Sequence, residues 1–115
     1  MIEILKSSRD LTEVEQYMLT LNPAIKVIKN IEDGTQITVD AWVTFIDTKD
    51  DGEQVHLLSI LDVDGTVYSC QSETFKNSFF EIARICDKKT FTIVKLGGQT
   101  KKGREYINCG LVSVH

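Results

Sequence analysis

Hydrophobic and polar residues alternate along residues 36–47, the stretch around which the rest of the chain is organised. This period of two predicts a strand with one face in the core. The opposite face consists of Thr and Asp residues and of Trp42, the one large ring among them. The apolar positions that we expect on the buried face are Ile37, Val39, Ala41, Val43 and Phe45.

Two more strands are predicted directly after this stretch, over residues 53–61 and 66–71. A turn-rich segment, residues 48–52, comes before the first of them, and Asp64-Gly65 separates the two. An Asp-Gly pair tolerates the positive φ angles of a tight hairpin turn. Residues 36–71 are therefore predicted to form a three-stranded meander.

The residues before the meander predict a short extension that packs on it, because they are too few to bury a core of their own. Asp10 and Glu13 have the spacing of a capping box at a helix start, and Pro23 ends that helix. The elements expected here are a strand at 2–6, a helix at about 11–21, a strand at 24–31 and a hairpin turn at 32–35. The helix is expected to bury Leu11, Val14, Met18 and Leu21.

A second helix is predicted after the meander, with Ser72 as its N-cap. It is followed by a strand at 91–96, a flexible loop at 97–104 and a final strand at 105–114. Gly110 within the last strand indicates a bulge or a close backbone approach. The apolar stripe of the helix, which we interpret as core, consists of Phe75, Phe79, Ile82, Ala83 and Cys86, widened by Phe80 and Ile85.

From residue 36 onward the predicted order is strand, strand, strand, helix, strand, strand. One helix between the third and fourth of five strands is the layout of the OB-fold, a small, partly open Greek-key barrel. An α+β sandwich could share this order. We therefore expect an all-β protein with helices, in which residues 1–35 form a helix-and-strand extension and residues 36–115 an OB barrel, all within one domain.

Length and composition are those of one globular domain: 115 residues, 42% apolar and 26% charged. No apolar run is long enough to span a bilayer and the first residues do not form a signal peptide, so we expect a cytoplasmic protein without a membrane partner. Cys70, Cys86 and Cys109 are odd in number and contain no C-x-x-C pair, which predicts buried free thiols.

The net charge of −4 is unevenly distributed along the chain. Residues 1–71 carry 5 basic and 13 acidic side chains, whereas residues 72–115 carry 8 basic and 4 acidic ones. An acidic protein as a whole does not attract nucleic acid. Any contact with phosphates must therefore come from a local patch in the second half.

Two segments carry a resemblance to a known family. One is Gly97-Gly-Gln-Thr-Lys-Lys-Gly-Arg-Glu-Tyr-Ile-Asn-Cys109, which joins two predicted strands, and the other is Asp62-Val-Asp-Gly-Thr-Val-Tyr68, before the Ser-capped aromatic helix. Together they resemble the small OB-type single-stranded-DNA-binding proteins of Gram-positive phages and mobile plasmids, over about residues 36–114. The resemblance implies binding of single-stranded DNA without sequence specificity, in replication or recombination of such an element and beside its replication proteins.

Each candidate contact has a second, structural interpretation. Trp42 is either a platform on which a base stacks or a core residue covered by the extension. The basic cluster after Gly97-Gly98 either pairs with phosphates or is a solvated hairpin tip. The predicted nucleic-acid contacts are Trp42, Tyr68, Lys95, Lys101, Lys102, Arg104 and Tyr106.

Motifs for catalysis or for cofactor binding do not emerge. His56 and His115 have no partner at a spacing that suggests a catalytic pair, and neither a P-loop nor a dinucleotide fingerprint is present. We expect no enzyme, no metal and no cofactor. The alternative function is a protein-interaction adaptor on the same barrel, and a small-ligand binder is a remote third. The sequence does not decide between DNA and RNA as the ligand, nor between a monomer and a homo-oligomer.

Overall fold

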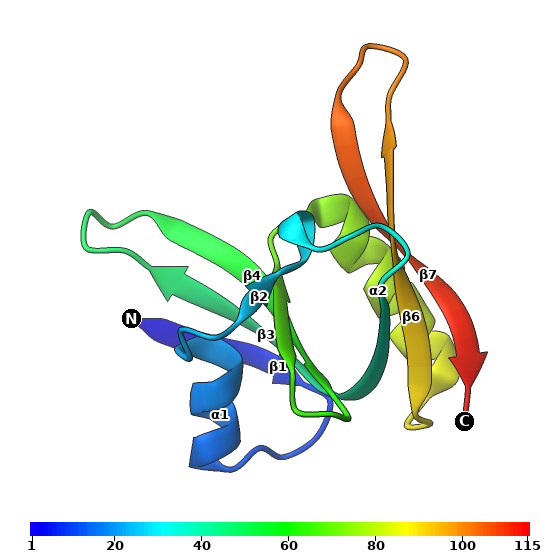
Figure 1. Ribbon diagram of the computed structural model, residues 1–115. Coiled ribbons are helices and arrows are strands. Elements are labelled where there is room, and N and C mark those ends of the chain that lie inside the picture. Colours follow the sequence, from blue (N-terminus) through cyan, green and yellow to red (C-terminus); the bar gives the residue numbers. More distant parts are fainter.

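Seven strands form one curled, mixed sheet in the computed structural model, which describes residues 1–115, and the sheet bends into a half-barrel with two α-helices (Figure 1). The strands are β1 (Ile2–Ser7), β2 (Lys26–Val27), β3 (Gln36–Thr48), β4 (Gln54–Asp62), β5 (Val67–Cys70), β6 (Phe91–Gln99) and β7 (Glu105–Val114). The helices are α1 (Glu13–Thr20), the short 3-10 helix Ile28–Asn30 and α2 (Glu73–Cys86). The predicted order of elements from residue 36 onward is thus confirmed.

The long strand β3 is the centre of the sheet, whose order is β2-β5-β4-β3-β6-β7. Its first residues, 36–39, pair with β6, whereas residues 43–47 pair with β1 on the same side. β4 pairs with β3 along most of its other side. Because β3 exchanges one neighbour for another along its length, the sheet curls around it.

A bulge in β3 divides its apolar side chains between two cores. The register with β4 shifts by one residue between Val39 and Ala41, and an extra residue reverses which side chains point to which face. Accordingly Val39 belongs to one buried cluster, whereas Val43 and Phe45 belong to another. The prediction of one continuous apolar face was wrong, and the bulge is why Trp42 packs against the first cluster.

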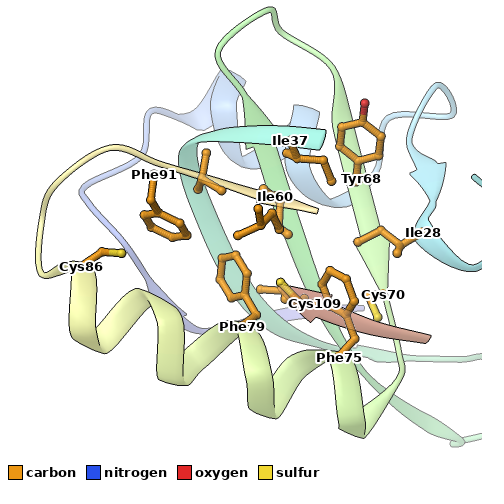
Figure 2. Packing of buried hydrophobic residues seen from close by; sticks show 13 residues of the cluster. Ile28, Ile37, Ile60, Tyr68, Cys70, Phe75, Phe79, Cys86, Phe91 and Cys109 are labelled. Atoms are coloured by element: carbon orange, nitrogen blue, oxygen red, sulfur yellow. The ribbon is translucent and has the colours of Figure 1, made fainter. Parts of the chain in front are cut away.

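The larger cluster of 13 buried residues fills the space between the sheet and α2. Phe75 and Phe79 point from α2 toward the sheet (Figure 2) and have no exposed surface, so the predicted apolar stripe of this helix is confirmed at its centre. Ile85 is 62% exposed and does not widen the stripe. The smaller cluster joins α1 to the other face of the sheet through Leu19, Val43, Phe45 and Val67.

Helix α1 begins two residues later than its sequence pattern predicts. Thr12, and not Asp10, is the N-cap: its hydroxyl accepts the backbone N–H of Glu15, and the Glu15 carboxylate accepts that of Thr12. Arg9 also donates to Glu15 and, with the Thr12 N–H, lowers the pKa of that carboxyl to about 2. The buried residue of α1 is Leu19, whereas Val14 and Leu21 are exposed, against expectation.

Thr12→Ala is expected to lower the free energy of unfolding by about 1 kcal/mol, because it removes the acceptor of the Glu15 N–H at the start of α1. Chemical denaturation followed by circular dichroism measures this change. Asp10→Ala is the matched control, and we expect it to leave the midpoint unchanged. An equal loss in both variants would contradict the assignment of the cap to Thr12.

The segment before β3 is less regular than predicted. Only Lys26–Val27 is extended, and it pairs in parallel with β5, so residues 32–35 do not close a hairpin between neighbouring strands. The 3-10 helix follows directly, and its first residue, Ile28, is fully buried in the larger core. After it, the Gly34 N–H donates to the Lys95 carbonyl at 2.7 Å, which ties this segment to β6.

The β6–β7 hairpin is longer, and its loop shorter, than predicted, because Gly97 and Gly98 pair within the ladder. Glycine is required at both positions because a neighbouring side chain lies where a Cβ would be. A Cβ on Gly97 would lie 2.5 Å from the Asp33 carboxylate, and one on Gly98 would lie 2.6 Å from the Tyr106 hydroxyl. Gly110 also packs closely, since a Cβ there would lie 3.2 Å from Leu96. The register shift of this ladder is elsewhere, between Thr92 and Ile93. Neither α-helix is long and apolar enough to cross a membrane.

Candidate nucleic-acid interface

A groove of about 840 Å³ opens beside Trp42, between β3, the segment after β1 and the C-terminal half of α2. The partly buried indole packs edge-to-face on Phe79, with ring centroids 5.9 Å apart, and lies 5.8 Å from the Phe80 ring. These two rings fix the orientation of the indole while part of it stays open to the groove. Trp42 therefore supports the core and also lines a surface groove.

The side chains that line this groove carry an excess of positive charge. Arg9 is paired with Glu15 at 2.7 Å and with Asp40 at 3.4 Å, and Arg84 is paired with Glu81. The three lysines of the groove make no ion pair. The charged residues of the lining are Lys6, Arg9, Arg84, Lys88 and Lys89, against Asp40 and Asp87.

An unusual backbone turn places two of these lysines at the groove. Asp87 ends α2 with φ of 37°, and Lys88 follows with φ of 62°. Positive φ is uncommon for residues other than glycine and costs on the order of 1–3 kcal/mol. Residues 87–90 are not among the contacts predicted from the sequence. The pair Lys88-Lys89, one turn after Arg84 at the end of an aromatic helix, is the pattern that could have identified this edge of the site.

The basic cluster Lys101, Lys102 and Arg104 lies at the tip of the β6–β7 hairpin, which projects from the body of the molecule (Figure 1). All three side chains are exposed. The turn itself is ordered, because the Thr100 N–H donates to the Arg104 carbonyl at 2.8 Å. Tyr106, at the base of the tip, is 44% exposed and rests on Gly98. This group is free to meet a ligand.

Two of the predicted contacts are buried instead. Lys95 is 4% exposed, and its ammonium donates to the Ile31 carbonyl at 2.8 Å and to the Asp33 carboxylate at 2.6 Å. Tyr68 is 8% exposed within the larger core, and burial raises the pKa of its hydroxyl. Lys95 ties residues 31–33 to β6 and Tyr68 fills the core, so the ammonium of Lys95 is already paired, although this residue lines a hollow near the base of the tip.

Trp42 and the basic tip do not share one groove. A second hollow of about 690 Å³ lies near the base of the tip, between Ser72 at the start of α2 and Tyr106, and it shares no residue with the Trp42 groove. Thr90 and Phe91 line the Trp42 groove at the start of β6, whereas the tip follows the end of β6. Since a strand rises about 3.3 Å per residue, the nine residues of β6 separate the two groups by roughly 30 Å.

The stretch that joins the two groups is the basic part of the protein. Residues 88–115 carry six basic side chains and one acidic one, Glu105, whereas residues 1–87 carry seven basic and sixteen acidic ones. The positive charge therefore lies at the two ends of the β6–β7 hairpin, since the strands themselves carry only Lys95 and Glu105. The tip of the β3–β4 hairpin is the opposite case, with Asp47, Asp50, Asp51 and Glu53.

Side chains that could ligate a metal are not clustered. No group of three or more His, Cys, Asp or Glu side chains is placed to hold a metal ion. The three cysteines are free and buried, as predicted, and burial raises the pKa of the Cys109 thiol to about 12, which keeps it from acting as a nucleophile at neutral pH. Comparison with protein-family models, with curated proteins and with solved structures finds no significant match to this chain.

Proposed function

We propose that this protein binds single-stranded nucleic acid without sequence specificity, on an OB-type half-barrel. The observation that carries the proposal is the position of Trp42, whose indole is held by two phenylalanine rings at the edge of a groove with five basic and two acidic side chains. The order of strands and helix from β3 onward supports the OB assignment.

The chemistry of the groove favours a single strand over a duplex. A base that stacks on an aromatic ring gains about 1–3 kcal/mol, and every base has a face that can do so. In a duplex these faces are covered by the neighbouring base pairs. Lys6, Lys88 and Lys89 have no acidic partner, so they are available for phosphates, which position a strand without reading its sequence.

Titration with labelled oligo-dT tests the proposal, by fluorescence anisotropy and by the emission of Trp42, the single tryptophan of the chain. We expect binding that quenches this emission and that weakens steeply as salt is raised, because bound phosphates release their counterions. A duplex of the same length and an oligo-U strand are the comparisons. Absence of binding at micromolar protein and low salt would overturn the proposal.

The setting we propose is the replication or recombination of a phage or mobile element, in accordance with the resemblance of residues 62–68 and 97–109. An adaptor function is the second candidate. It is favoured by exposed apolar side chains on β1 and α1, where Ile4, Val14, Tyr17 and Leu21 are 37–71% exposed. A protein partner that is retained from nuclease-treated host lysate, together with no binding of oligo-dT or oligo-U, would favour the adaptor.

A further inference from the structure

We propose that one strand of nucleic acid binds along the β6–β7 ladder, defined as strands β6 and β7, from the Trp42 groove at one end to the basic tip at the other. High affinity then requires a strand long enough to reach both ends. This inference rests on the proposed function and adds to it the length of the ligand and its path.

The ladder has free cations at both of its ends. Lys88 and Lys89 lie directly before β6 at the Trp42 groove. Lys101, Lys102 and Arg104 lie at the other end, exposed and without ion pairs. The remaining cation, Lys95, is used internally by Asp33. Phosphates can therefore be held at both ends, and not between them.

The strands between the two ends carry few charged groups, although the Asp33 carboxylate, 64% exposed, lies beside Gly97 and pairs with Lys95 at 2.6 Å. Glu105 is the one acidic residue of the ladder. The exposed apolar residues of the ladder are Leu96, Tyr106, Leu111, Val112 and Val114, each 43–45% exposed. These residues lie on two faces: Leu111 and Val114 pair with the core residues Ile93 and Phe91, whereas Leu96 and Tyr106 share the opposite face, on which bases can rest. Tyr106, next to the tip, supplies a second ring on which a base can stack.

The other direction out of the Trp42 groove is unfavourable. It follows β3 toward the β3–β4 tip, which carries Asp47, Asp50, Asp51 and Glu53. The cations there are both paired with Asp47, Lys49 at 3.0 Å and the N-terminal ammonium of Met1 at 3.8 Å. Like charges repel a polyanion, so the charge distribution selects the β6–β7 ladder.

The length of β6 sets the length of the ligand. Nine residues at about 3.3 Å each give roughly 30 Å between the two ends. A stacked strand advances about 3.4 Å per nucleotide, so about nine nucleotides reach from one end to the other. A strand of five nucleotides can occupy one end only, whereas one of fifteen can occupy both. The second contact is then intramolecular, which raises affinity without any new binding surface.

The experiment compares dT5 and dT15 in the wild type and in the triple variant Lys101→Ala/Lys102→Ala/Arg104→Ala, at about 0.15 M salt, where charges act over only about 8 Å. In the wild type we expect Kd to fall at least tenfold more between dT5 and dT15 than in the triple variant. The triple variant shows how much a longer strand gains merely from its larger number of binding registers. Lys26→Ala/Lys49→Ala, which removes cations outside the ladder, is the control that keeps the wild-type length dependence.

Two results would overturn the inference while leaving the proposed function intact. One is a triple variant that binds both lengths as the wild type does. The other is a triple variant that weakens dT5 as much as dT15, because the tip and the Trp42 groove would then contact the same short strand. If neither length binds any of the proteins, the proposed function itself fails.

Discussion

Replacing Phe79 by alanine is expected to lower the free energy of unfolding by about 3–5 kcal/mol. The side chain has no exposed surface and lies in the cluster between α2 and the sheet. Its ring centroid is 5.9 Å from that of Trp42, 6.1 Å from that of Phe80 and 5.9 Å from that of Phe91. Truncation removes all three ring contacts and leaves a cavity. Since domains of this kind have about 5–15 kcal/mol of stability in total, the loss is a large fraction of it.

Urea denaturation followed by circular dichroism measures this loss, with the emission of Trp42 as a second probe of the same cluster. Ile85→Ala is the matched control, because Ile85 lies on the same helix and is 62% exposed. We expect the control to change the free energy of unfolding by less than about 0.5 kcal/mol. Equal effects of the two substitutions would show that α2 does not dock with the face that carries Phe79.

Replacing Trp42 by leucine is expected to weaken the binding of oligo-dT by about 5- to 150-fold. One base–aromatic stack is worth about 1–3 kcal/mol, and each 1.4 kcal/mol is a factor of ten in Kd. Leucine keeps apolar contact with Phe79 and Phe80 but offers no ring to a base. Trp42→Phe retains a ring, and we expect it to recover most of the lost affinity.

Fluorescence anisotropy with labelled oligo-dT measures both variants, at a temperature at which circular dichroism shows them folded. The comparison of leucine with phenylalanine separates stacking from packing, since both substitutions shrink the side chain in the larger cluster. Should the leucine variant bind oligo-dT as tightly as the wild type, Trp42 would be a core residue only. The proposed interface would then have to lie elsewhere on the molecule.

The order of strands and helices could be predicted from the sequence because it depends on local patterns. The Asp-Gly turn, the Ser72 cap and the Phe75–Phe79 stripe each determine structure within a few residues. The cap of α1 was placed on the wrong residue, since Asp10 and Thr12 each have a Glu three residues later and only the fold decides between the two capping boxes. Residues 24–31 could not be predicted, because they are held by Ile28 in the core and by Lys95, which reaches Ile31 from the distant strand β6.

The candidate site could be predicted only in part, for the same reason. The tip residues are exposed because a hairpin tip has nothing to pack on. Contacts between elements far apart in the sequence bury Lys95 and Tyr68. Such contacts also bring Lys6 and Arg9 together with Lys88 and Lys89 in one groove. No period or spacing within a single segment contains that information.

The extra residue in β3 determines which of two interiors receives the tryptophan. If the same residues alternated regularly, with no residue left out of the ladder between Val39 and Ala41, the indole would turn toward α1, away from Phe79 and the lysines that follow α2. The aromatic part of the groove thus depends on how the backbone of β3 pairs as much as on the type of side chain.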